Sequence, residues 1–232
     1  MAAMLDASAV RWHEVLDLYG VVVKEMAKGK KKDKAEQLLE LDNWFQQELP
    51  VSISSREEKY LTKDELTKLM TWKLSRGKFR PRLVDLIKSN SDDKIDTLTK
   101  KAFKLLPDVI QAIKVLSELN GVGPATASAI LCAGSPNVPF MADEAMASLP
   151  SGQGKLQYTP KAYQAYLDDL RGVLTKLQKE DPEGKWDEHK VELALWTYTV
   201  ASKHAPHLLD SGKTSKRKTS ENTNEGIKRS KK

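Results

Sequence analysis

Two glycines on either side of a valine mark the part of this 232-residue chain where chemistry is most readily expected. An apolar helical stretch ending near Leu119 runs into Gly121-Val122-Gly123, and Pro124 follows where a new helix should begin. Glycine permits a positive φ and lets another backbone approach closely, and proline suits the first helical position. The first N–H groups of a helix have no partner inside it and lie at the positive end of its dipole. The turn is therefore a candidate phosphate-binding site, with Val122 expected to pack inward.

A run of positive charge lies between residues 72 and 82. It contains no acidic residue; beside the aromatic Trp72 and Phe79 it holds five basic ones, Lys73, Arg76, Lys78, Arg80 and Arg82. Residues 1–210 carry 30 basic and 30 acidic side chains, so this patch stands out from a neutral background. We expect the five to contact phosphates, which gives salt-dependent affinity without sequence reading. The alternative is a solvated loop face.

The segment from Leu119 to Leu131 resembles the helix–hairpin–helix of the DNA glycosylase superfamily, which includes endonuclease III, the adenine glycosylases and the alkyl-base glycosylases. That motif runs roughly Leu-Pro-Gly-(Val/Ile)-Gly-x-x-Thr-Ala. Asn120 replaces the usual proline, and six positions match: Leu119, Gly121, Val122, Gly123, Thr126 and Ala127. The resemblance covers roughly residues 60–150. It implies binding of double-stranded DNA through Gly121, Val122, Gly123, Ala125 and Thr126.

The resemblance also implies a catalytic aspartate after an apolar segment that often contains proline, here Pro139-Phe140-Met141-Ala142-Asp143. In endonuclease III a catalytic lysine stands shortly after the second glycine, and the aspartate follows it at a fixed spacing. The same register, without a gap, gives Ala125 and Asp143 in this chain. Alanine cannot form a Schiff base, which excludes lyase chemistry through position 125. The implied reaction is hydrolysis of an N-glycosidic bond after base flipping, with Asp143 stabilising the charge on the sugar and water as nucleophile.

Three interpretations of function follow from these residues. The first is a monofunctional DNA N-glycosylase, and the second is a catalytically inactive DNA-binding or scaffold protein with the same fold. The second is favoured by residues 144–150, which lack the arginine often seen there in the family, and it leaves Asp143 as a helix N-cap. The third is a helical protein-interaction module. Four aromatic residues are candidates for lining a base pocket: Trp44, Trp72, Phe140 and Trp196.

Helical periodicity predicts an all-α fold, a two-lobed helical bundle with a helix–hairpin–helix motif. Helices are expected over 9–27 and 38–45, from a capping box at Thr62–Glu65, and then over 83–87, 95–103, 107–119, 163–177 and 191–200. The basic stretch 28–34 is expected to be a loop, and Pro50 is expected to end the second helix. The predicted division is 1–59, N-terminal helices of the second lobe; 60–150, the hairpin lobe; 151–210, C-terminal helices completing the second lobe; and 211–232, a disordered basic tail.

Cysteine and histidine usage predicts no metal and no cofactor. Cys132 is the single cysteine, which excludes a disulfide framework, a cysteine-ligated iron–sulfur cluster and a Cys-rich zinc site. The four histidines show no metal-ligand spacing: His13, His189, His204 and His207. No apolar run is long enough to cross a bilayer, so no membrane span is expected, and the N-terminus does not resemble a signal peptide.

The chain's excess positive charge lies in the segment 211–232, which holds eight basic and two acidic side chains. Two basic clusters, Lys216-Arg217-Lys218 and Lys228-Arg229-Ser-Lys231-Lys232, resemble a bipartite nuclear import signal. This predicts a nuclear protein with an import receptor as a partner. The alternative is a basic tail that adds non-specific DNA affinity.

Overall fold

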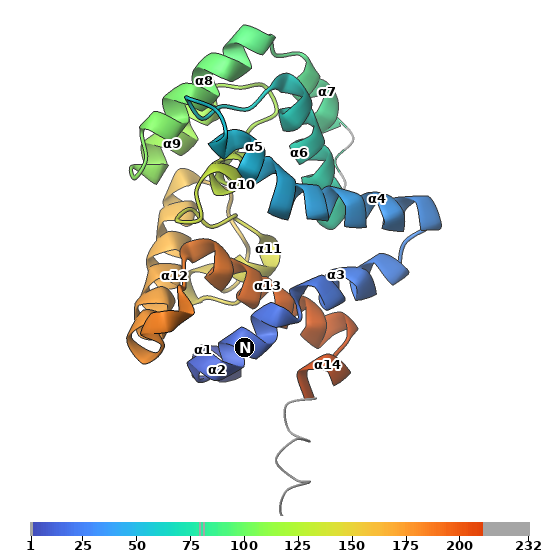
Figure 1. The fold of residues 1–232 in the computed structure, drawn as a ribbon, viewed down its shortest axis with the longest axis vertical. Helices are drawn as coiled ribbons and strands as arrows, with labels where there is room; N and C mark the ends of the chain where they lie inside the picture. Colours follow the sequence, from blue (N-terminus) through green and yellow to red (C-terminus); the bar gives the residue numbers. More distant parts are fainter. Residues whose placement is uncertain (1, 79, 81, 211–232) are drawn as a thin grey trace, which may run out of the picture.

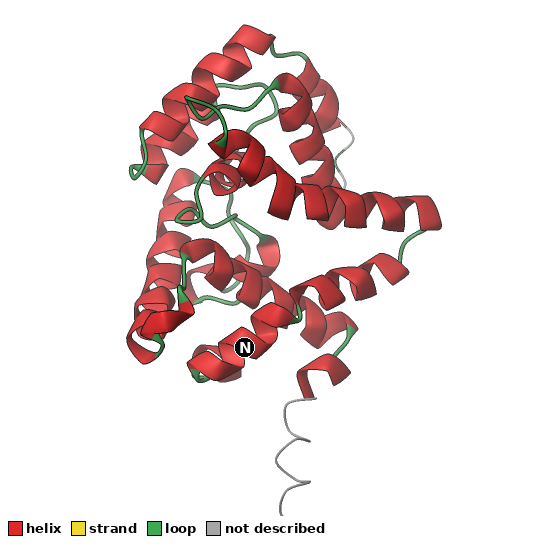
Figure 2. Cartoon of the chain, viewed as in Figure 1, coloured by secondary structure: helices red, strands yellow, loops and turns green. Residues whose placement is uncertain are grey.

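The computed structural model describes residues 2–78, 80 and 82–210, which form helices and loops with no strand (Figures 1 and 2). This confirms the predicted all-α class. Short π-helical (η1) and 3₁₀ (η2, η3) segments accompany the α-helices. In chain order the elements are α1 (Ala2–Leu5), α2 (Ala9–Asp17), α3 (Tyr19–Lys28), α4 (Lys32–Asn43), η1 (Trp44–Glu48), α5 (Leu49–Ser54), α6 (Lys63–Arg76), α7 (Arg82–Lys88), α8 (Asp92–Lys104), α9 (Val109–Leu116), α10 (Pro124–Gly134), α11 (Asp143–Met146), η2 (Pro150–Gly152), α12 (Pro160–Glu180), η3 (Pro182–Gly184), α13 (Glu188–His204) and α14 (His207–Asp210).

The helices gather in two groups (Figure 1). In the upper group of that view α4 packs on α6, α5 on α10 and α8 on α9. In the lower group α2, α3 and α12 pack against α13, which also contacts α11. Residues 1–59 are thus divided between the two groups, with α2 and α3 in one and α4 and α5 in the other. The contact between α3 and α4 joins the groups at one edge.

Several helices begin at a side-chain cap, one of which the sequence predicts. The capping box at α6 is confirmed, because Thr62 accepts from the Glu65 N–H at 3.2 Å and Glu65 accepts from the Thr62 N–H at 2.9 Å. Ser91 and Asp108 cap α8 and α9 by accepting backbone N–H bonds of 3.3 and 3.1 Å. Pro107 therefore lies one residue before a cap, not in the first turn of the helix as predicted.

Two predicted helices have different boundaries in the structure. The helix expected over 9–27 is interrupted at Leu18 and becomes α2 and α3, and both Trp12 and Val22 are buried. Pro50 does not end its helix, because α4 passes without a break through η1 into α5, of which Pro50 is the second residue. The loop before α4 is also shorter than the predicted 28–34, since α4 begins at Lys32.

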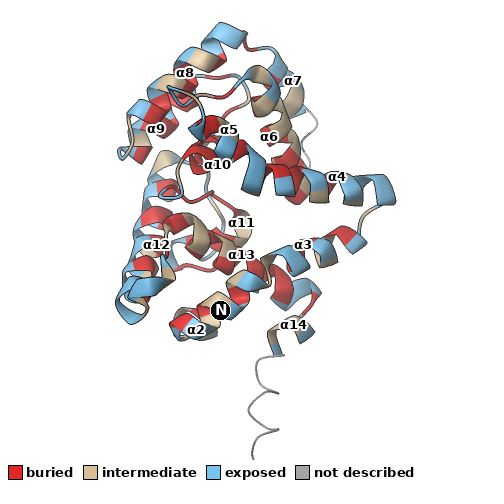
Figure 3. Cartoon of the chain, viewed as in Figure 1, coloured by how far each residue is buried: buried red, intermediate tan, exposed pale blue. Residues whose placement is uncertain are grey.

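A continuous apolar core connects the two groups and is visible as the buried inner faces in Figure 3. At its centre Trp72 of α6 stacks on Phe45 of η1, with ring centroids 3.6 Å apart and planes 7° from parallel. Phe140 lies 5.4 Å from Trp72, ring centroid to ring centroid. Packing of large aromatic rings of this kind stabilises a core strongly. It also holds α6 and the segment before Asp143 in a defined relation to each other.

Candidate functional site

The glycine turn between α9 and α10 has the backbone geometry expected from its sequence. Gly121 has φ of +79°, in the left-handed region that favours glycine. A Cβ at this position would lie 3.0 Å from the Leu86 Cβ and 3.2 Å from the Leu83 carbonyl oxygen, so α7 packs directly on the turn. Gly123 is extended, and a Cβ there would meet no atom within 4 Å. Val122 is buried, as predicted.

Asn120 ties the turn to the end of α7. Its backbone N–H donates to the Asn90 Oδ1 at 2.9 Å, and its carbonyl accepts from the Asn90 Nδ2 at 3.0 Å. Its own side chain donates to the Ser89 hydroxyl at 3.1 Å. Asn90 is buried, so this reciprocal pair fixes the turn where a proline would otherwise stiffen it.

Three backbone N–H groups of the turn are unpaired among the described residues. They belong to Gly121, Gly123 and Ala125, whereas the N–H groups of Thr126 and Ala127 bond to the Gly123 carbonyl at 2.9 Å each. The unpaired donors lie at and before the first turn of α10, where the helix dipole adds positive potential. Such a set of donors is suited to binding an anionic oxygen.

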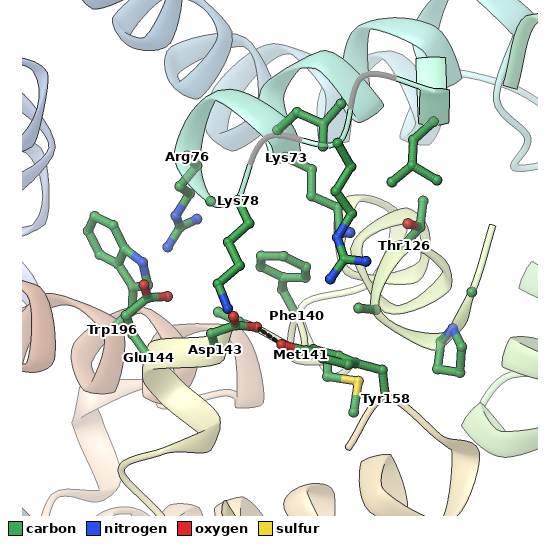
Figure 4. Close-up of a pocket in the computed structure, with 18 of the residues that line it drawn as sticks. Lys73, Arg76, Lys78, Thr126, Phe140, Met141, Asp143, Glu144, Tyr158 and Trp196 are labelled. Carbon is green, nitrogen blue, oxygen red and sulfur yellow. Dashed lines mark hydrogen bonds between the residues drawn. The ribbon is translucent and has the colours of Figure 1, made fainter. Parts of the chain in front are cut away.

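A pocket of about 530 Å³ opens beside this turn, between α6, α10 and α11 (Figure 4). It brings together most of the residues that the sequence singled out. Those of them that line it are Lys73, Arg76, Lys78, Arg80, Gly121, Gly123, Ala125, Thr126, Phe140, Asp143 and Trp196. Val122 and Arg82 do not line it: Val122 is packed in the core, and Arg82 is exposed at the start of α7.

The segment that carries Asp143 into the pocket is held by side chains of α10 and α12. The Met141 N–H donates to the Ser128 hydroxyl at 2.9 Å. Tyr163 and Tyr166, both fully buried on α12, donate to the carbonyls of Pro139 and Phe140 at 3.0 Å each. Burial raises the pKa of both tyrosine hydroxyls well above the usual value, so they remain donors. Both tyrosines therefore position the site as well as packing in the core.

Asp143 is half-buried at the first residue of α11. The N-cap of that helix is Ala142, so the predicted alternative of an N-cap role for Asp143 is wrong. Its Oδ1 accepts a hydrogen bond of 2.8 Å from the hydroxyl of Tyr158 (Figure 4). Desolvation, followed by this hydrogen bond, raises the pKa of Tyr158 to about 12. Tyr158 was not among the residues expected from the sequence, because a single aromatic residue in a loop belongs to no periodic pattern.

The basic residues of the 72–82 segment differ in how they are placed. Lys78 and Arg80 are exposed, and Lys73 is half-buried. Arg76 is buried beside Glu192, with its Nη2 3.8 Å from the Glu192 Oε1, and its guanidinium lies 4.1 Å from the centre of the Trp196 ring. This burial argues against the predicted phosphate contact by Arg76, because its guanidinium nitrogen atoms are not accessible to a DNA strand. Phe79 lies outside the described residues.

The aromatic candidates divide into pocket and core residues. Phe140 and Trp196 line the pocket with largely buried rings. Trp72 is fully buried in its stack on Phe45, and Trp44 packs under the Lys68 ammonium group at 4.7 Å. Periodicity places all of these rings inside the protein but does not distinguish a pocket wall from a core.

The described residues contain no group of three or more His, Cys, Asp or Glu side chains placed to hold a metal ion. In the same part of the chain, no helix has both the length and the apolar character needed to cross a membrane. Cys132 is buried, with its Sγ 3.2 Å from the Nδ1 of His189. The predicted import-signal residues in 211–232 lie outside the described residues.

Comparison of the chain with models of protein families, with curated proteins and with solved structures gave no match.

Proposed function

We propose that this chain is a nuclear DNA-binding protein with the two-lobed helix–hairpin–helix fold of the DNA glycosylases, and that it hydrolyses the N-glycosidic bond of a flipped base. The observation that carries the proposal is that the unpaired N–H groups of the glycine turn and the Asp143 carboxylate open into one pocket. These features lie apart in the sequence, on either side of α10. Their meeting in one cavity depends on the packing of α10 and α12 around the segment 139–142.

Double-stranded DNA would bind along the surface formed by the turn and the end of α6. The N–H groups of Gly121, Gly123 and Ala125 would donate to a phosphate oxygen, and Lys78 and Arg80 would neutralise neighbouring phosphates from the opposite rim. Contacts of this kind fix the position of the strand without reading its sequence. Their affinity falls steeply as salt rises, because bound counterions are released.

Asp143 would act on the sugar of the flipped nucleotide. As the base leaves, positive charge grows on the deoxyribose, and a nearby carboxylate stabilises it and orients the attacking water. The Tyr158 hydroxyl holds one carboxylate oxygen, which leaves the other for the sugar or water. The volume of about 530 Å³ is adequate for one flipped base. The base itself would lie toward Phe140 and Trp196.

An inactive DNA-binding or scaffold protein is the second candidate. It is favoured by the same Tyr158–Asp143 hydrogen bond, since a rim residue already engages the carboxylate that the reaction needs. Under this proposal the turn and the basic rim bind DNA as above and no base is excised. In both cases the two basic clusters of the tail would bring the protein to the nucleus through an import receptor.

The decisive experiment incubates the protein with duplexes carrying uracil, hypoxanthine, alkylated or oxidised bases and measures base release. Asp143→Asn removes the charge while keeping the shape, and Glu36→Gln, an exposed change on α4 outside the pocket, is the matched control. We expect release by the wild type and by Glu36→Gln, and loss of release in Asp143→Asn with DNA binding retained. DNA binding without release on every duplex would support the inactive protein instead. Absence of DNA binding would refute both proposals.

A further inference from the structure

A second group of lysines lies where α3 and α4 meet, far in sequence from the glycine turn and the 72–82 segment. Residues 24–34 hold six lysines and two acidic side chains, and we call this segment the lysine tip. α3 ends at Lys28 and α4 begins at Lys32. Figure 1 shows both helices running to the right edge of the view, where the connection between them projects from the body. Because residues 1–210 carry equal numbers of basic and acidic side chains, the tip is a concentrated positive surface on a neutral body.

Ion pairs inside the tip neutralise only part of this charge. Lys28 pairs with Glu25 at 2.6 Å, and the Lys32 ammonium group lies 4.0 Å from a carboxylate oxygen of Glu36. Three further lysine side chains have no hydrogen bond or ion pair with any described residue: Lys24, Lys30 and Lys31. Lys24 and Lys31 are exposed, and Lys30 is half-buried. These three ammonium groups are therefore free to bind an external anion.

The lysine tip adjoins the wall of the pocket that faces the glycine turn. Met26, close to the end of α3, lines the pocket, as do Trp196 and His204 of α13, the helix against which α3 packs. Figure 4 shows Trp196 on the opposite side of the cavity from Thr126, which belongs to the first turn of α10. The pocket therefore extends from the glycine turn to the C-terminal ends of α3 and α13. A strand that passes from the turn across Asp143 continues toward the lysine tip.

Duplex DNA is the partner that fits this arrangement. Phosphates recur about every 3.4 Å along each strand, so a duplex bound at the turn presents further phosphates beyond the pocket. A lysine pairs with phosphate as a point charge on a flexible stem, and such a contact needs no fixed fork geometry. An acidic peptide would match the charge of the tip, but its binding would not require the tip to adjoin the pocket.

We propose that the lysine tip is a second duplex-binding surface, which holds the DNA on the side of the pocket away from the glycine turn, so that one duplex spans both groups of helices. This inference rests on the proposed function, because the duplex reaches the tip from its site at the turn. It assigns phosphate contacts to Lys24, Lys30 and Lys31, which lie outside the segment that resembles the hairpin motif. Contacts at both ends of the groove fix the position of the duplex over Asp143.

The first test compares two charge-reversal variants of the full chain by fluorescence anisotropy of a labelled duplex. Lys30→Glu/Lys31→Glu changes the tip, and Lys101→Glu/Lys179→Glu changes exposed lysines of α8 and α12 outside the pocket. Each variant lowers the formal net charge from +6 to +2, so the two are matched in overall charge. Glutamate at positions 30 and 31 precedes α4, where a negative charge is favourable to the helix dipole, so the tip variant should keep the wild-type Tm.

The tip variant should bind the duplex roughly tenfold or more weakly at a salt concentration of about 0.1 M. The slope of log affinity against log salt should also become smaller by about 2, since each lost phosphate contact removes about 0.9. The control variant should stay within about threefold of the wild-type affinity, because exposed charges distant from the DNA are screened by salt. Its salt slope should be unchanged.

A cross-linking measurement locates the contact and needs only single substitutions at exposed positions. Lys31→Cys introduces an accessible thiol, whereas the one native cysteine, Cys132, is buried. A photoreactive group attached at position 31 should cross-link to the duplex, and the same group attached through Lys101→Cys on α8 should not. Adding Gly123→Ala to the Lys31→Cys protein should reduce the cross-link at position 31, because one duplex is held at both ends of the groove.

Three outcomes would overturn the proposal while leaving the glycine turn its role. They are equal losses of affinity in the two charge-reversal variants or no loss in either, a cross-link no stronger at position 31 than at position 101, and a cross-link at position 31 that Gly123→Ala does not reduce. The last would show that the tip binds DNA separately from the pocket. Lack of DNA binding by the wild type would overturn the proposed function and this inference together.

Discussion

Substitution by alanine should affect different properties at the two glycines of the turn. Gly121→Ala adds a methyl group where φ is +79° and where the Leu83 carbonyl oxygen would lie 3.2 Å from the new Cβ. Gly123→Ala adds the same group to an extended backbone with open space around it. The first change should therefore affect stability and the second should affect DNA binding.

The expected magnitudes follow from this geometry. A left-handed alanine costs about 1–2 kcal/mol and crowding against α7 costs about 1–3 kcal/mol more, so Gly121→Ala should lower the free energy of unfolding by roughly 2–5 kcal/mol. Gly123→Ala should change it by less than about 1 kcal/mol, because a weaker N-cap is offset by a less flexible unfolded chain. Its methyl group would instead obstruct a phosphate at the N–H groups of Gly123 and Ala125. Loss of hydrogen bonds to a charged group, about 1.5–3 kcal/mol, corresponds to a roughly 10- to 150-fold weaker affinity.

The assay combines thermal unfolding with fluorescence anisotropy of a labelled duplex at a fixed salt concentration of about 0.1 M. Gly121→Ala should lower the Tm by about 5 °C or more. Gly123→Ala should keep the wild-type Tm and bind DNA much more weakly. Wild-type affinity in a stable Gly123→Ala protein would refute the role of the turn as a phosphate site. A Gly121→Ala protein as stable as the wild type would refute the packing argument.

Three further predictions concern charged and titrating groups. Burial lowers the pKa of Lys73 below its value in the unfolded chain, so the charged ammonium group destabilises the folded protein at neutral pH. Lys73→Met should therefore raise the Tm at pH 7, and a lower Tm would contradict this. Tyr158 should titrate near pH 12 by ultraviolet absorbance, and Asp143→Asn should shift that pKa toward its usual value by removing the carboxylate that stabilises the hydroxyl; an unchanged titration would show that the hydrogen bond is absent in solution. Glu192→Gln should lower the unfolding free energy in urea by about 3–5 kcal/mol, since it removes the carboxylate that pairs with the buried Arg76 guanidinium. A loss below about 1 kcal/mol would show that other acidic groups, such as Asp42 and Glu144, compensate that charge.

The all-α class and the main helix starts could be predicted from sequence because their causes are local. The capping box at Thr62 and the glycine requirement at position 121 depend on residues a few positions apart or on the φ of one residue. The helix boundaries at Leu18 and Pro50 could not be predicted in the same way. Both depend on packing with distant elements. Such packing favours an interruption of the helix at Leu18 and continuation of the helix past Pro50.

The candidate site shows the same division. Residue types alone determine that a glycine turn, a run of basic side chains and an aspartate after an apolar segment are present. Only the tertiary structure decides that Arg76 is buried beside Glu192 while Lys73 opens into the pocket, because a charge run does not reveal which face of α6 is covered. Tyr158 contacts Asp143 only because the loop that carries it folds back to α11. A contact of this kind produces no periodic pattern in the sequence from which it could be predicted.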